Sequence, residues 1–150
     1  MAKQKKHTCG QVLLRLGFVV YVAAMVWLLF GQRWGEEFYR SVNLRPLVTI
    51  RLYWRLLHRE SAYLVRHAFI NLVGNVVMFI PLGFFQPYLF PKLRRWYKTL
   101  LCTIVLILVI ECVQYLTGLG SCDVDDLILN TFGALLGYGL WRITNKTSRA

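Results

Sequence analysis

Polar side chains that could do chemistry stand at helical spacing inside long apolar stretches of the chain. They form three groups whose members are three or four positions apart: Asn71 and Asn75; Glu111 and Gln114; Asp123, Asp126 and Asn130. Residues at this spacing share one face of a helix. Carboxylate and amide groups on such faces can hold a hard cation through oxygen, relay protons, or hydrogen-bond a lipid headgroup.

Glu111 points most strongly to function. A carboxyl group in a membrane span must be protonated, paired or bound to a cation. Asp123 and Asp126 stand at the expected N-cap and N3 positions of a helix, where acids complement the helix dipole whatever the function. The asparagines and Gln114 are equally consistent with hydrogen bonds that join neighbouring helices. A binding site and a purely structural role therefore both stay open for these residues.

The stretches that carry these groups are long enough to cross a membrane. The chain has 150 residues, 57% of them hydrophobic and 17% charged, whereas soluble domains carry about 25% charged residues. Four apolar stretches approach the length that a spanning helix needs; we expect spans at about 12–30, 68–86, 99–118 and 123–141. The second should kink near Pro81 and end near Gln86. The predicted fold is all-α, an integral membrane four-helix bundle with an external amphipathic connector helix.

The charges of the loops predict the orientation. The loop before the third span carries Lys92, Arg94, Arg95 and Lys98 without an acid, whereas the next loop carries Asp123, Asp125 and Asp126 without a base. Because basic loops stay inside, we expect a multi-pass protein of the bacterial plasma membrane with both termini cytoplasmic, 1–11 and 142–150 being basic tails. The net charge is +11, but the basic residues flank the apolar stretches instead of forming one face. Nucleic acid is therefore not an expected partner.

The connector between the first two spans is rich in arginine. Arg51, Arg55 and Arg59 recur every four residues among apolar and aromatic neighbours, which predicts a helix lying in the headgroup layer. Guanidinium binds phosphate in bidentate fashion, so this face is a candidate site for phospholipid or lipid-carrier headgroups. An amphipathic connector held by ordinary lipid contacts is the alternative.

Under this topology the polar groups lie at a similar depth below the outer membrane surface. At 1.5 Å per residue, Glu111 lies about 18 Å from the inner start of its helix, while Asn75 and Asn130 lie within the first turns below the outer surface. We therefore expect one outward-facing polar pocket. Gly133 and Gly137 form a GxxxG pattern, which predicts close helix packing. The four cysteines show no metal-ligand spacing.

The polar residues also resemble the signature of VanZ-like membrane proteins. The resemblance covers about 42–138 and rests on Asn71, Asn75, Phe79, Pro81, Gly83, Glu111, Gln114, Asp123, Asp126, Asn130, Gly133 and Gly137. Asn43-Leu44-Arg45-Pro46-Leu47 is similar to the Asn-Leu-x-Pro-Phe stretch that precedes that family's second span. Leu119 and Cys122 replace an arginine and an aromatic residue of many members, so a carboxylate to arginine contact is not implied in this loop. The resemblance implies a single membrane domain over 12–141 in a bacterial envelope protein; the founding relative is linked to teicoplanin resistance, and the family has no established reaction.

Three hypotheses for function follow. In the first, the pocket and the arginine face bind membrane lipid, a lipid-linked cell-wall precursor or a lipoglycopeptide, without chemistry. In the second, Glu111, Asp123 and Asp126 hold a divalent cation in an enzyme that modifies a lipid headgroup; the sequence shows no Ser or Cys nucleophile beside a base. In the third, Glu111 relays protons or ions in a small transporter. The first fits the resemblance best.

Overall fold

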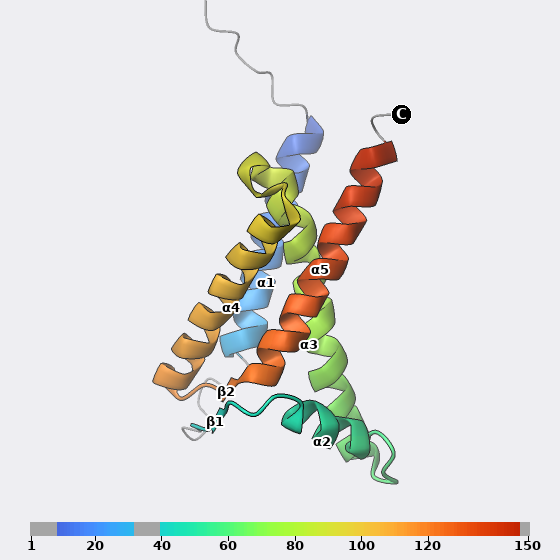
Figure 1. Cartoon of the computed structure of the whole chain (residues 1–150), viewed down its shortest axis with the longest axis vertical. Coiled ribbons are helices and arrows are strands. Elements are labelled where there is room, and N and C mark those ends of the chain that lie inside the picture. Colours follow the sequence, from blue (N-terminus) through green and yellow to red (C-terminus); the bar gives the residue numbers. More distant parts are fainter. Residues whose placement is uncertain (1–8, 32–39, 148–150) are drawn as a thin grey trace, which may run out of the picture. The chain divides into compact units, whose positions relative to one another are not determined.

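The computed structural model describes residues 9–31 and 40–147. Its elements are α1 (Cys9–Phe30), β1 (Val42–Asn43), α2 (Val48–Leu56), α3 (Ala62–Leu89), the 3-10 helix η2 (Pro91–Leu93), α4 (Trp96–Thr117), β2 (Cys122–Asp123) and α5 (Val124–Thr147) (Figure 1). The predicted all-α class is confirmed, with two short strands added. The predictions for the basic ends of the chain at 1–8 and 148–150 fall outside the described residues.

Three of the predicted spans are long apolar helices. Gly10–Phe30, Ala62–Leu89 and Trp96–Thr117 are long and apolar enough to cross a membrane, as expected of a membrane protein. Residues 1–34 and 35–150 form two separate compact units, so α1 stands as a unit of its own. α3 continues through Pro81 and Pro87 to Leu89, three residues beyond the predicted end of the second span near Gln86. Helices in a membrane tolerate proline when their neighbours satisfy the freed backbone groups.

The fourth predicted span is a helix, but it does not join the three apolar ones. α5 begins at Val124 and continues six residues beyond the predicted end, to Thr147. Asp125, Asp126 and Asn130 lower its hydropathy. With 24 residues it is about 36 Å long at 1.5 Å per residue, enough for a hydrocarbon core of about 30 Å. A fourth crossing, and with it the four-helix bundle, stays a prediction.

α3 and α5 form the main helix contact of the second unit, and glycine makes it close. A Cβ placed on Gly133 would lie 2.0 Å from the carbonyl oxygen of Val76, and one on Gly137 would lie 1.9 Å from that of Ile80. From the other side, a Cβ on Gly83 would lie 1.9 Å from the oxygen of Ala134. The close packing predicted from the GxxxG pattern is therefore confirmed, as backbone against backbone.

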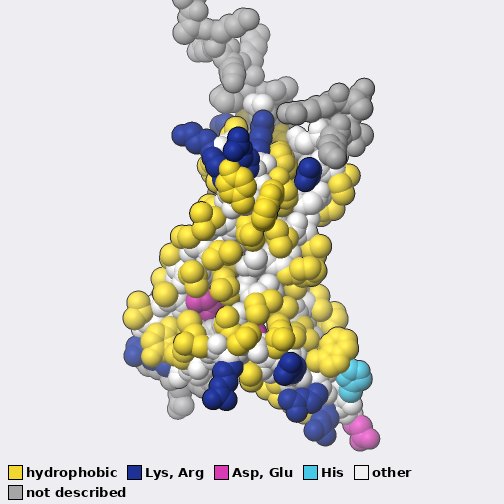
Figure 2. Space-filling model, in the orientation of Figure 1, with side chains coloured by type: hydrophobic (Ala, Val, Ile, Leu, Met, Phe, Trp, Pro, Cys, Tyr) yellow, Lys and Arg dark blue, Asp and Glu magenta, His cyan; other side chains and the backbone are white. Residues whose placement is uncertain are grey.

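α4 packs on this pair through apolar and polar contacts. Phe79 and Ile107 are fully buried. Beside them the hydroxyl of Thr103 donates to Oε1 of the buried Gln86 over 3.0 Å, which joins α4 to α3. Figure 2 shows apolar side chains over the middle of the visible face and basic ones toward its ends, the distribution that a bilayer favours.

The amphipathic connector helix is present but shorter than predicted. α2 has no buried residue, and both Arg51 and Arg55 are exposed on it. The prediction that Arg59 continues their helical stripe is wrong, because α2 ends at Leu56. After that residue the chain tightens into a turn in which the N–H of Arg59 donates to the oxygen of Leu56 over 3.2 Å.

Candidate functional site

The site begins with a parallel ladder of two short strands. β1 pairs with β2 so that Val42 lies opposite Cys122 and Asn43 opposite Asp123. The N–H of Cys122 also donates to the oxygen of Ser41 over 3.0 Å. The ladder thus brings the segment before α2 against the segment that begins α5.

Asp123 is the centre of the hydrogen bonds that follow. Its Oδ1 accepts from the amide of Asn43 over 3.0 Å and from the N–H of Asp125 over 2.8 Å. Its Oδ2 accepts from the hydroxyl of Thr49 over 2.6 Å. The bond from Asp125 is that of an N-cap residue to the second residue of its helix, so the predicted capping position of Asp123 is confirmed. Asp123 is 7% exposed.

Asp125 holds α2 in place. Its side chain is fully buried; Oδ1 accepts the N–H of Leu47, and Oδ2 accepts those of Thr49 and Ile50 over 2.7 and 3.0 Å. The first N–H groups of a helix have no partner within it, and a carboxylate there also suits the helix dipole. In the sequence Asp125 stands out only as a loop charge, because no local pattern pairs residues 75 to 78 positions apart.

Two further bonds connect the spans. Oε2 of Glu111, which is 4% exposed, accepts the N–H of Asp123 over 3.1 Å. The amide of Asn75 donates to Oδ1 of Asp126 over 2.6 Å, from α3 to α5. We call Asn75, Glu111, Asp123 and Asp126, with Asp125, the carboxylate cluster.

The other three predicted pocket residues are Asn71, Gln114 and Asn130. Asn130 is 3% exposed, and its Oδ1 is buried without a hydrogen-bond partner. Asn71 donates to the oxygen of His67 on its own helix over 2.8 Å. The side chain of Gln114 lies against Gly120 in the loop before β2. The structure thus brings four of the seven predicted residues into direct contacts and places Asn130 among the buried ones.

Arg40, which the sequence did not single out, binds the C-terminal end of α4. Nη2 of Arg40 donates to the oxygen of Leu116 over 2.9 Å, and its guanidinium lies 6.0 Å from the centre of the Tyr115 ring. A cation at the end of a helix binds carbonyl groups that lack partners within it. Arg40 thus binds the end of α4, near the loop that contains Leu119 and Cys122.

The cluster does not have the form of a metal centre. Among residues 9–31 and 40–147, no group of three His, Cys, Asp or Glu side chains is placed to hold a metal ion. The divalent cation that the second hypothesis places at Glu111, Asp123 and Asp126 therefore gains no support from the described residues. Both oxygens of Asp123 and of Asp125 accept hydrogen bonds from the chain itself. The arrangement is suited to holding several elements in a fixed geometry around a few remaining polar atoms.

Two comparisons with known proteins place the chain among sequence relatives. The model of the VanZ/LLP1 family matches residues 17–145, a range that includes the whole cluster. Protein VanZ of Enterococcus faecium is 27% identical over 143 residues, which cover 91% of this chain and 78% of that protein. No solved structure matches the chain.

Proposed function

Since the chain belongs to the VanZ/LLP1 family, we propose that it acts at the outer leaflet of the bacterial plasma membrane on or with a lipid-linked or lipidated molecule. In this proposal the protein gives resistance to teicoplanin and related glycopeptides, and the molecule that it meets is a lipid-linked cell-wall precursor or the lipoglycopeptide itself. The positive-inside pattern of the loops supports an outward-facing cluster end.

The observation that carries the proposal is the carboxylate cluster, which lies where α5 begins and includes residues within the apolar helices α3 and α4. Charged and amide groups are costly in a membrane and mark functional places there. The cluster joins β1, α2, α3, α4 and α5, and Asp125 holds the start of α2 by three hydrogen bonds. The cluster thereby fixes a helix with exposed arginines beside helices that span the membrane.

This geometry fits a ligand with an anionic head and an apolar tail. Arg51 and Arg55 are exposed on α2 and present guanidinium groups for a phosphate. α2 packs on α3, where Phe69 and Ile70 are 55% and 54% exposed and offer apolar surface for an acyl chain. The buried Oδ1 of Asn130, which has no partner, adds an acceptor between the helices. The role is binding, with no bond made or broken.

Growth inhibition by teicoplanin tests the proposal. A sensitive Gram-positive host would express the wild type, Glu111→Gln or Glu60→Gln at matched membrane levels, beside an empty vector. Gln keeps an acceptor for the N–H of Asp123 and removes the charge, while Glu60 lies exposed in the turn before α3. We expect resistance from the wild type and Glu60→Gln, and its loss in Glu111→Gln. Full resistance from Glu111→Gln would remove the cluster from the mechanism, and no resistance from the wild type would contradict the proposed role.

A further inference from the structure

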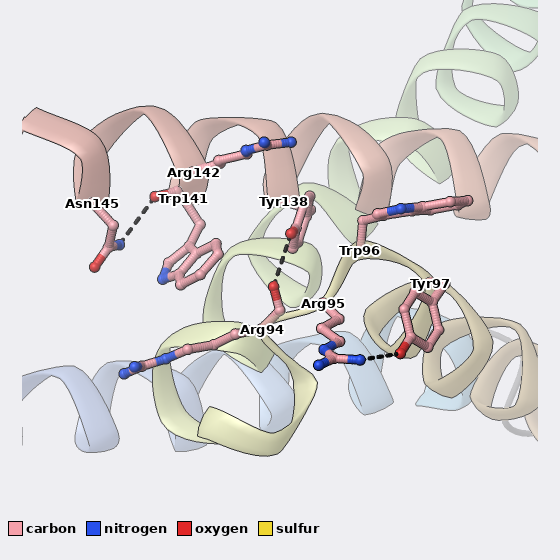
Figure 3. A pocket seen from close by; sticks show the side chains of 8 residues that line it. All are labelled: Arg94, Arg95, Trp96, Tyr97, Tyr138, Trp141, Arg142 and Asn145. Carbon is pink, nitrogen blue, oxygen red and sulfur yellow. Dashed lines mark hydrogen bonds between the residues drawn. The ribbon is translucent and has the colours of Figure 1, made fainter.

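A pocket of about 500 Å³ lies where α4 begins and α5 ends, at the opposite end of both helices from the carboxylate cluster (Figure 1). Eight residues line it: Arg94, Arg95, Trp96, Tyr97, Tyr138, Trp141, Arg142 and Asn145 (Figure 3). The hydroxyl of Tyr138 donates to the oxygen of Arg94 over 2.9 Å. This bond ties α5 to the turn that precedes α4 and fixes the two walls.

The walls carry positive charge that the chain does not balance there. Arg94, Arg95 and Arg142 are exposed. All seven acids of the sequence lie between residues 36 and 126, and none lies in 61–110 or after 126. Arg95 donates to the hydroxyl of Tyr97 over 3.0 Å. Of the other two, Figure 3 shows the guanidinium of Arg94 on the side of the indole nitrogen of Trp141, whereas that of Arg142 extends the other way along α5.

A buried donor points to the same class of ligand. Trp141 is 8% exposed, and its indole Nε1 is buried without a hydrogen-bond partner. An unpaired buried N–H is costly. In Figure 3 this edge of the indole and the guanidinium of Arg94 point to the same side of the pocket, below Asn145. An anionic group placed on that side would face both donors.

The surroundings distinguish a lipid from a small anion. Trp96 and Tyr97 are 56% and 44% exposed beside the pocket, and such aromatic side chains mark the headgroup level of a bilayer. Toward the middle of the helices follow exposed apolar side chains, among them Leu101 on α4 and Leu136 on α5, at 63% and 42%. They provide a path for acyl chains next to an anion site.

We propose that this pocket binds the phosphate headgroup of an anionic phospholipid in the leaflet at this end, which is the cytoplasmic one under the predicted topology. Arg94 contacts the phosphate, the indole of Trp141 donates a hydrogen bond to it, and Arg142 adds positive charge at the wall formed by α5. Basic pockets between membrane helices on this side are a recognised kind of headgroup site. The bound lipid links the start of α4 to the end of α5. The inference is independent of the proposed outer-leaflet function.

Lipid retention by the purified full chain tests the proposal. Protein in detergent would be incubated with phosphatidylglycerol or with phosphatidylcholine, and bound lipid measured by native mass spectrometry. Arg94→Gln/Arg142→Gln is compared with Lys92→Gln/Lys98→Gln, which removes the same charge from exposed positions near the pocket. Trp141→Phe removes the indole N–H and keeps an aromatic ring.

We expect preference for phosphatidylglycerol, about tenfold weaker retention in the arginine pair, a smaller loss in Trp141→Phe, and wild-type retention in the lysine pair. Equal losses in the two pairs, or no loss in the arginine pair, would overturn the site. A competition arm with inorganic phosphate separates the two sources of the anion. Displacement of the lipid by phosphate at comparable concentration would overturn the lipid assignment in favour of a soluble phosphate.

Discussion

Where α5 begins, carboxylate oxygens accept hydrogen bonds from N–H and O–H groups of the same chain; where α5 ends, guanidinium and indole groups line a pocket. Asp123 and Asp125 are buried and use all four of their oxygens internally. Trp141 is equally buried, but its donor has no partner. The first end is therefore organised before any ligand arrives, whereas the second is complete only with an anion from outside.

The packing of α3 on α5 positions both the carboxylate cluster and the pocket, so disrupting this packing should disturb both. In Gly137→Ala the new methyl group would meet the backbone oxygen of Ile80, which cannot move as a side chain can. Overpacking costs about 1–3 kcal/mol and occasionally more. We expect most of the folded protein to be lost, as measured by size-exclusion chromatography in detergent.

Gly139→Ala is the matched control for this substitution. A Cβ at Gly139 has nothing within 4 Å, and alanine stabilises a helix interior by about 1 kcal/mol relative to glycine. The control should stay folded. Equal yields of folded protein from the two variants would show that the backbones of α3 and α5 do not approach as closely as described.

Removal of one carboxylate should disturb the cluster end alone. Asp125→Ala leaves the N–H groups of Leu47, Thr49 and Ile50 without their acceptor, at a cost of about 1–3 kcal/mol for each buried unsatisfied group. Hydrogen exchange of residues 47–56, followed by mass spectrometry, should become much faster, while lipid retention at the pocket stays unchanged. Asp125→Asn, which keeps one acceptor oxygen, should give an intermediate rate. Unchanged exchange in Asp125→Ala would contradict the anchoring role.

The side of the membrane on which each end lies can be tested with Cys122. Burial raises the pKa of its thiol, so the thiolate that reacts with maleimide is scarcer at a given pH than in an exposed cysteine. In a chain whose other cysteines are alanine, a membrane-impermeant maleimide should label Cys122 on intact cells, slowly near neutral pH and faster as the pH rises. With Cys122 also replaced by alanine, Lys98→Cys should label only after permeabilisation. The reverse pattern would invert the topology.

Much of this contrast could be predicted from the sequence, because helical spacing is a local property. The spacing of Asn71 and Asn75, and of Glu111 and Gln114, predicted that each pair shares one face of a helix. The GxxxG pattern predicted the close helix packing that is found between α3 and α5. Burial of Glu111 followed from the cost of a charge in an apolar helix.

What sequence reasoning missed depends on contacts between distant segments. The ladder that brings Asn43 to Asp123 joins residues 80 positions apart, and two-residue strands leave no periodic pattern. In the sequence, the arginines of the pocket indicate only which side of the membrane their segments occupy. Nothing local shows that Arg94 and Arg142 share a cavity with Trp141. The end of α2 before Arg59 reflects the turn that must precede α3.

If function resides in the carboxylate cluster, the loss of a charge there should affect resistance more than the loss of two charges at the pocket. Teicoplanin susceptibility would be compared for Asp126→Asn and Arg94→Gln/Arg142→Gln at matched membrane levels in the same host. Asn at position 126 keeps an acceptor for the amide of Asn75 and loses the charge. We expect Asp126→Asn to lose resistance and Arg94→Gln/Arg142→Gln to keep it. Full resistance from Asp126→Asn, with loss in the arginine pair, would contradict this expectation.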